Sequence, residues 1–311
     1  MEKPFKPHDD LILLLEKRGI DFSKPGSKST AKKYLQRIGY YNLINGYSSL
    51  FYEDGKVDSY LPGTTIDEIY ALYIFDRKIR AIVLENILPF EENIKALIAY
   101  HFPKAHPESN YLTYTNFDNA KKDASKNVTS LIAGVQKQIA DRSSDPSIEH
   151  YLRKYGYVPL WVLTNILSLG TISKFYSLMQ QKERQDIAKT FRLQDKELES
   201  VLMYVSSVRN FCAHGNRLYC YRTNRPLSDS ALHDVLQIPR NEKGEYAYGK
   251  RDLFAVLIAL KLVQSKTQYR KMLHDVNGCL NELAGSLSVI AIKDVLVCMG
   301  FPEDWRKKLQ K

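Results

Sequence analysis

Residues 198–219 read LESVLMYVSSVRNFCAHGNRLY, and this stretch is the most informative part of the chain. Its first half has an apolar residue at every third or fourth position, which predicts a helix with one buried face. The residues of that face are Leu198, Val201, Leu202, Val205 and Val208. The helix should end near Gly215, because glycine readily adopts the backbone conformation that terminates a helix. Arg209 and His214 are therefore expected in the last turns of an amphipathic helix.

The same helical periodicity extends through most of the 311 residues, so the predicted fold class is all-α. Thr65 and Glu68 form a capping box that begins a long helix. Pro89 is expected to kink or divide that helix, which then continues as far as Pro103. Other helices are expected at 9–18, about 30–38, about 128–141, 159–179 with a pause at Gly170, about 251–264, 267–283 and 288–299. Residues 104–127 are expected to form a mobile surface segment, and the loop 215–249 allows a short β-hairpin.

Composition excludes several classes of protein. The chain has 45 Lys and Arg against 35 Asp and Glu, and its four cysteines form no CxxC pair. This cysteine usage argues for a reducing compartment and against a structural zinc site. The longest apolar run near the N-terminus, Leu11 to Leu15, is too short for a signal peptide or a membrane span. We expect a soluble cytoplasmic protein without metal or cofactor, and its net charge of +10 is only a weak indication of a polyanionic partner.

Arg209, Asn210 and His214 combine groups that suit phosphodiester chemistry without a metal. Asn210 and His214 are one helical turn apart and share a face, while Arg209 and His214 are separated by about 140° around the axis and about 7.5 Å along it. A histidine moves protons near neutral pH, and an arginine stabilises charge on phosphate oxygens. Residues 209–219 contain no carboxylate. The alternative is structural: a helix-ending histidine that caps carbonyl groups beside a solvated arginine.

The residues around this pair resemble the R-N-x-x-A-H-x-x-R-L motif of the HEPN superfamily, in its branch of AbiD/AbiF-like abortive-infection proteins. Five blocks occur in the family's order, and together they extend over nearly the whole chain. They are Ile38–Leu43 with Gly46 and Tyr47, Leu72–Arg80, Pro159–Trp161 with Gly170–Ser173, Arg209–Tyr219, and Met299–Pro302 with Trp305.

The resemblance implies a HEPN helical bundle as the core, at residues 63–265. An N-terminal helical region at 1–62 and a C-terminal one at 266–311 would extend it. It also implies an endoribonuclease with Arg209 and His214 as catalytic residues and Asn210 in support. In that superfamily the catalytic pairs come from two HEPN units that face each other. This chain has one clear copy of the motif, so we expect a homodimer.

The implied reaction is attack by a ribose 2′-OH on the adjacent phosphate, which leaves a 2′,3′-cyclic phosphate and a 5′-OH end. The implied role is a toxin in phage defence, controlled in some members by a noncoding RNA antitoxin. Two other functions stay open. The chain can be a catalytically inactive module that sequesters RNA or a protein partner, or a structural scaffold that has kept the fold.

Several further residues are candidates for RNA binding. Arg217 belongs to the motif, and Tyr219, Tyr221, Arg222 and Arg225 follow it. Together they combine cations with rings that can stack on bases, and the alternative for the residues after the motif is a solvated loop. Arg80 can contribute to the wall of the site, although a helix-face ion pair with Asp76 is the simpler interpretation. Asn165 occupies the position where many relatives carry a glutamate, so it can orient a phosphate but cannot act as a base. Lys95 and His101 are a weak candidate for a second, decayed motif.

Overall fold

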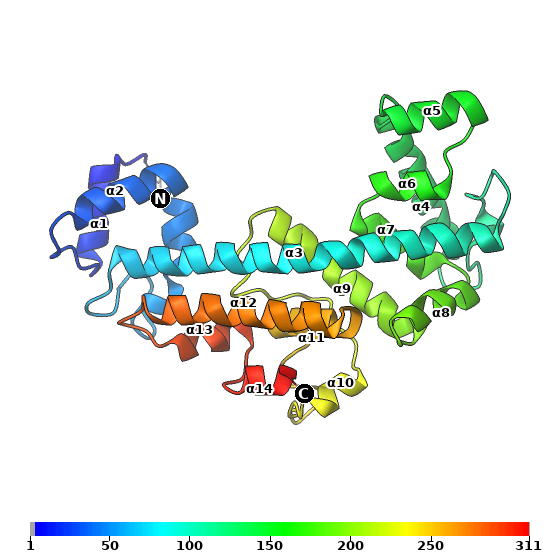
Figure 1. Ribbon diagram of the computed structural model, residues 1–311. Helices are drawn as coiled ribbons and strands as arrows, with labels where there is room; N and C mark the ends of the chain where they lie inside the picture. The colour runs from blue at the N-terminus through cyan, green and yellow to red at the C-terminus, as the bar shows by residue number, and fades with distance from the viewer. Residues whose placement is uncertain (1–3, 311) are drawn as a thin grey trace.

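The computed structural model describes residues 4–310, and within this range the chain is all-α. Figure 1 shows one long helix, α3, along the whole molecule, with a group of helices at each end and a third group beneath it. The α-helices are α1 (His8–Lys17), α2 (Ser27–Ile38), α3 (Ile66–Ala105), α4 (Ala124–Asp141), α5 (Pro146–Tyr155), α6 (Leu160–Ile166), α7 (Leu169–Leu178), α8 (Gln181–Thr190), α9 (Asp195–Ala213), α10 (Ala231–Val235), α11 (Leu253–Val263), α12 (Lys266–Ala284), α13 (Ile292–Met299) and α14 (Trp305–Gln310). Short helical turns occupy η1 (Tyr41–Asn45, π-helical), η2 (Ser49–Phe51) and η3 (Tyr114–Asn116).

Helix α3 begins at the predicted capping box, where Thr65 accepts from the Glu68 N–H and the Glu68 carboxylate accepts from the Thr65 N–H. Its 40 residues correspond to a rod of about 60 Å. One stripe of the helix is buried along its full length. Because α12, α9, α6 and α8 all pack on α3, this helix connects every part of the fold.

The expectation that Pro89 divides this helix is wrong, since α3 continues through Pro89 and through Pro103 to Ala105. Pro89 lies on the exposed side of α3, while its neighbours Ile87 and Phe90 are buried on the other. Gln264 donates a hydrogen bond to the carbonyl of Asn86, one turn before the proline, at 2.9 Å. Tertiary packing on both sides therefore holds together a helix that the proline alone would interrupt.

Other boundaries also differ from the expectation. The pause after Pro159 falls at Leu167 and Ser168 rather than at Gly170, because Ser168 caps α7 through the N–H of Thr171. The hairpin expected within 217–249 is absent, and residues 4–310 contain no strand there or elsewhere. Within 217–249 the backbone forms one isolated antiparallel bridge, between Arg240 and Tyr246.

The segment expected as a mobile surface excursion is a loop that is fixed to the core. Phe117 is buried among the aromatic rings of Phe102 and Phe175, and the hydroxyl of Tyr111 donates to the Val158 carbonyl at 2.6 Å. Buried aromatic side chains anchor a loop in the way that they anchor a helix.

The most apolar helix, α11, is buried on all sides from Leu253 to Leu260 and forms the centre of the lower group of helices. No helix within residues 4–310 is long and apolar enough to cross a membrane.

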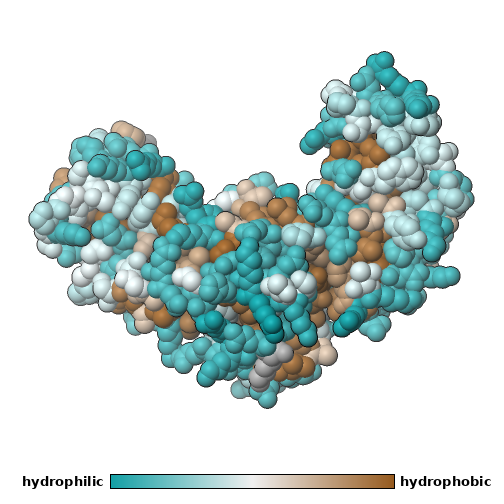
Figure 2. Space-filling model, in the orientation of Figure 1, coloured by the Kyte–Doolittle hydropathy of each residue, from teal (hydrophilic) through white to brown (hydrophobic). Residues whose placement is uncertain are grey.

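The molecule is V-shaped, as Figure 2 shows, with α1 and α2 on one arm and α4 to α7 on the other. The concave face between the arms lies above α3, and the end of α9 is at its centre.

Candidate active site

Helix α9 carries the quoted motif and ends where the sequence predicts. His214 is the residue that closes the helix, with its N–H bonded to the Asn210 carbonyl at 3.1 Å, and Gly215 follows with φ +72°. A residue with a side chain adopts that left-handed conformation only with strain. The exposed side of α9 is formed by Met203, Ser207, Asn210 and His214, so Asn210 and His214 share a face as expected.

His214 and Asn210 are free to bind a ligand. Both are exposed, and within residues 4–310 neither side chain has a hydrogen bond or ion pair. The capping role that the structural alternative gives to His214 is therefore not played by its imidazole.

Arg209 is only 34% exposed and faces a carboxylate from α3. Its Nε lies 3.6 Å from Oε2 of Glu91, and these two buried atoms have no hydrogen-bond partner. The other oxygen of Glu91 pairs with Lys95 Nζ at 2.8 Å. Glu91 is not among the residues predicted from the sequence, because it is far from Arg209 in the chain. Only the packing of α9 on α3 brings the two together. The spacing of Glu91 and Lys95 was the one visible sign of this cluster.

Asp76 and Arg80 of α3 hold the turn that follows His214. Arg80 donates to the carbonyls of Gly215 and Asn216, the second at 3.0 Å, and its Nε lies 3.7 Å from Asp76. Asp76, which is fully buried, accepts a hydrogen bond from the Tyr219 N–H at 2.7 Å. The expected Asp76–Arg80 ion pair is therefore present, and the pair also fixes the backbone of the motif.

The N-terminal block joins the same network. The hydroxyl of Tyr47 donates to Asp76 at 2.8 Å, and its ring stacks on Tyr219 with 5.6 Å between the ring centroids. Arg217 donates to the carbonyls of Asn45 and Gly46 at 3.1 and 3.2 Å. Three of the sequence blocks, although far apart in the chain, meet at Asp76.

Burial changes the acid–base behaviour of this network. It raises the pKa of the Asp76 carboxyl above its usual range, although the bound N–H and hydroxyl groups oppose the effect. Burial also raises the pKa of the Cys212 thiol to about 12. Cys212 is thus protonated at neutral pH and is not a nucleophile, which leaves His214 as the exposed group at the end of α9 that can transfer a proton.

Two of the residues expected to stack on RNA bases are placed elsewhere. The rings of Tyr219 and Tyr221 are buried in the core, so the expectation of stacking is wrong for both. Both rings pack inward beneath the loop, so the cations next to them in the sequence do not form a stacking surface with them. Arg222 donates to the Cys298 carbonyl at 3.0 Å, which places it against the end of α13. Arg217 is exposed, but its guanidinium already bonds the N-terminal block.

Asn165 lies on the exposed side of α6 and donates to the Trp161 carbonyl of its own helix at 3.3 Å. With Lys95, Tyr100 and Trp161 it lines an open groove of about 640 Å³ between α3 and α6. Lys95 contacts Glu91, which faces Arg209, so the groove borders the catalytic candidates. Lys95 contributes to the candidate site through its ion pair with Glu91. Within residues 4–310 no hydrogen bond or ion pair joins Lys95 to His101, the other half of the weak second motif.

No group of three or more metal-ligating side chains occurs within residues 4–310. The end of α9 carries Arg209, Asn210 and His214. Glu91 of α3 faces Arg209, and the buried Asp76 with Arg80 holds the turn that follows His214.

Neither a curated protein nor a solved structure matches the chain. The model of a protein family described as Abi-like protein matches residues 33–220. This match contains the N-terminal block, the α3 block, the α6–α7 block and the motif at the end of α9, whereas the C-terminal block lies beyond it. The match covers more than half of the 311 residues and includes four of the five blocks that carry the resemblance. The chain therefore belongs to the Abi-like protein family.

Proposed function

We propose that this protein is a metal-independent endoribonuclease of the HEPN type that acts in phage defence by abortive infection. Membership of the Abi-like family supports the defence role. The observation that carries the activity is the exposed, unpartnered imidazole of His214 at the end of α9, with Asn210 on the same face and Arg209 in the preceding turn of the same helix.

The reaction follows from the chemistry of these groups. The ribose 2′-oxygen forms a bond to the adjacent phosphorus, the bond from phosphorus to the 5′-oxygen breaks, and the 2′-proton leaves as a proton reaches the 5′-oxygen. An imidazole can perform either proton transfer. Arg209 would stabilise the charge that builds on the phosphate oxygens.

The two proton transfers are best served by two imidazoles, and the end of α9 carries one, His214. We therefore propose a homodimer in which two copies of the α9 end face each other across a two-fold axis, with one His214 as base and the other as acid.

The test is cleavage of labelled RNA in excess chelator by wild-type protein and by His214→Ala and Arg209→Ala. We expect 2′,3′-cyclic phosphate ends and a loss of about 100-fold or more for each variant, because both groups act in the transition state. His274→Ala, on an exposed face of α12, is the matched control and should cleave like wild type. Complete inhibition by chelator, or an unchanged rate for His214→Ala, contradicts the proposal.

A second candidate is a module that binds RNA without cleaving it. The observation in its favour is Glu91, whose carboxylate faces Arg209 and offsets the charge that a transition state would use. RNA binding that survives in His214→Ala, with no cleavage by either protein, would select this function. Control by a noncoding RNA belongs to the first proposal, and sequencing of RNA that co-purifies with the inactive His214→Ala protein tests it.

A further inference from the structure

A second cavity lies far from the concave face, beneath α11 and between α10 and α14. Its volume is about 760 Å³, which is larger than the groove beside the catalytic candidates. Every residue that lines it lies between Arg222 and Pro302, beyond the region matched by the family model. The cavity is therefore built by a part of this chain that the family motifs do not explain.

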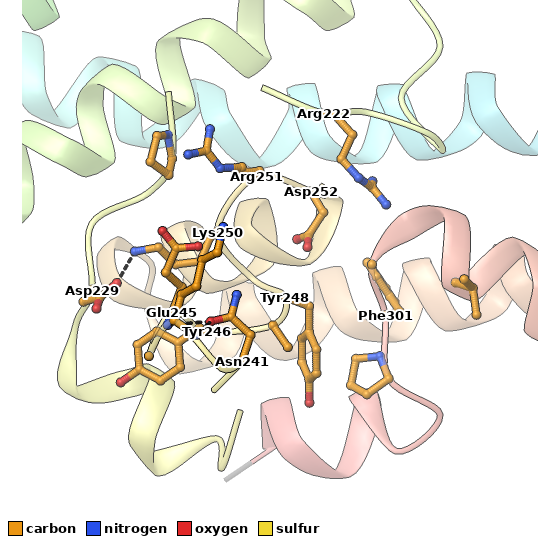
Figure 3. Close-up of a pocket in the computed structure, with 17 residues that line it drawn as sticks. Arg222, Asp229, Asn241, Glu245, Tyr246, Tyr248, Lys250, Arg251, Asp252 and Phe301 are labelled. Atoms are coloured by element: carbon orange, nitrogen blue, oxygen red, sulfur yellow. Dashed lines mark hydrogen bonds and ion pairs between the residues drawn. The ribbon is translucent and has the colours of Figure 1, made fainter. Parts of the chain in front are cut away.

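Two arginines line one side of this cavity, and neither has a carboxylate partner. Arg222 donates to the carbonyls of Tyr221 and Cys298, and Arg251 donates to those of Thr223 and Asn224. Among residues 4–310, no carboxylate oxygen forms an ion pair with either guanidinium. The backbone carbonyls thus fix the two cations in place without neutralising them. Figure 3 shows both on the same upper side of the cavity.

Three carboxylates line the cavity. Asp252 is buried, and its oxygens accept from the N–H groups of Gly249 and Ala255. Burial raises the pKa of its carboxyl, and the nearby Arg222 cation lowers the pKa against that rise. Asp229 pairs with Lys250, as the dashed line in Figure 3 marks. Glu245 lies on the opposite, lower side of the view. On the upper side, two guanidiniums against the one carboxylate of Asp252 leave a net positive charge, which attracts an anion.

The remaining wall is aromatic. Tyr248 is half-buried and projects below Asp252, and Phe301 flanks the cavity on the right of Figure 3. Both rings pack edge-on against Phe254, with centroid distances of 5.5 and 5.4 Å. This packing fixes the rings while one face of Tyr248 remains available to a flat ligand.

We propose that this cavity binds a nucleoside phosphate, with the phosphate on Arg222 and Arg251 and the base against Tyr248. A guanidinium matches phosphate oxygens in a bidentate manner, and an aromatic ring stacks on any base. A simple inorganic anion would use the arginines alone and leave the aromatic wall unoccupied. The ligand can be a free nucleotide or a nucleotide of an RNA strand, since both present the same chemistry.

The experiment is calorimetric titration of the full-length protein with AMP, ADP, ATP and inorganic phosphate. We expect a nucleotide to bind at least about tenfold more tightly than phosphate, and Arg251→Gln and Tyr248→Leu each to weaken its binding by about tenfold or more. Arg37→Gln, on an exposed position of α2, is the matched control and should bind like wild type. Nucleotide binding that is absent at millimolar concentration, or unchanged in both cavity variants, overturns the proposal.

A 2′-O-methyl tetranucleotide, which cannot be cleaved by 2′-OH attack, distinguishes the two sources. If it binds through Arg251 and Tyr248 while free nucleotides do not, the ligand is RNA; the reverse result assigns a free nucleotide. A tetraglutamate peptide that binds as tightly as ADP contradicts the proposal. If Arg251→Gln does not fold by circular dichroism, Arg251→Lys replaces it, and wild-type affinity in Arg251→Lys contradicts the bidentate contact. None of these measurements depends on ribonuclease activity.

Discussion

At the scale of single residues, the carboxylate of Asp76 joins the two halves of the candidate site. One oxygen accepts from the backbone of Tyr219, after the motif, and the other from the hydroxyl of Tyr47, in the N-terminal block. Asp76 has no exposed surface, so each of these donors would be left without a partner if the carboxylate were removed. The position of His214 thus depends on a residue that touches no substrate.

Asp76→Ala should lower the free energy of unfolding by about 3 kcal/mol, because two buried donors lose their acceptor. Asp76→Asn keeps an acceptor oxygen and should cost less. Urea denaturation measures both values, and amide exchange of the segment containing Tyr219 should accelerate in Asp76→Ala. Glu85→Gln, an exposed position on the same helix, is the control, and equal stability of Asp76→Ala and Glu85→Gln would refute the prediction.

The buried imidazole of His233 makes the free energy of unfolding depend on pH. Its Nδ1 accepts from the Ser230 N–H at 3.2 Å and its Nε2 lies 3.1 Å from the Gly249 carbonyl, an arrangement that fits the neutral ring. Burial lowers the pKa of His233 below its usual value of 6.5. The unfolded chain therefore takes up a proton near pH 6.5 that the folded protein does not bind. Stability is complete above this pH and declines below it, by up to about 1.4 kcal/mol per pH unit.

Thermal unfolding followed from pH 8 to pH 5 checks this dependence. His233→Gln should be less stable at pH 8 but should lose less stability on acidification. His274→Gln, which changes an exposed histidine, should follow the wild-type curve. A slope that is identical in wild type and His233→Gln would assign the pH dependence to other groups.

At the scale of elements, α3 shows how packing overrides local preference. A proline inside a helix removes one hydrogen bond and clashes with the preceding turn, yet α3 passes through Pro89 and Pro103. Seven other α-helices pack on α3, and the sum of these contacts exceeds the local cost. Because Asp76, Arg80 and Glu91 are on this one rigid helix, its continuity sets their relative positions.

Pro89→Ala should therefore stabilise the protein. The substitution restores an N–H to the helix, and the gain of about 3 kcal/mol is partly offset by about 1 kcal/mol from the greater freedom of the unfolded chain. A net increase of about 1–2 kcal/mol in the free energy of unfolding is expected from urea denaturation. Pro62→Ala, in the loop before α3, should give no increase, and a destabilised Pro89→Ala would show that the proline shapes the helix.

At the scale of the whole molecule, the concave face carries exposed apolar side chains. Figure 2 shows hydrophobic atoms there, over the end of α9 and beneath the arm that contains α6. Large apolar side chains are exposed on the three helices of this region: Leu88 on α3 (48%), Trp161 on α6 (54%) and Met203 on α9 (37%). Met203 lies on the same side of α9 as Asn210 and His214. Exposed apolar groups beside a site are typical of an interface, which agrees with the proposed homodimer.

Met203→Glu should convert the dimer into a folded monomer, because a charge would be buried against its symmetry mate. Light scattering should then give 35.9 kDa instead of twice that mass, and RNA cleavage should fall with the loss of dimer. Val235→Glu, an exposed apolar position on α10, is the control for the substitution itself. A Met203→Glu protein that remains dimeric would exclude this face of α9 as the interface.

The sequence was sufficient for the fold class, the family and the end of α9, because each depends on local pattern. Apolar spacing predicts α9, and the capping box at Thr65 marks the start of α3. Helices whose pattern is short or mostly polar were missed; they are α5 (Pro146–Tyr155), α8 (Gln181–Thr190), α10 (Ala231–Val235) and α14 (Trp305–Gln310). Their stability comes from contacts with the rest of the protein, which no local pattern records.

The tertiary structure alone decided which residues surround the motif. Composition placed Tyr219 and Tyr221 among cations and predicted an RNA surface, but packing buries both rings. No spacing could join Glu91 to Arg209 or Asp76 to Tyr219, since these contacts exist only where α9 and its following turn pack across α3. The sequence by itself determined which groups can carry the chemistry. The packing of distant segments determined which of those groups are exposed, which are held in place, and which carboxylate faces the arginine.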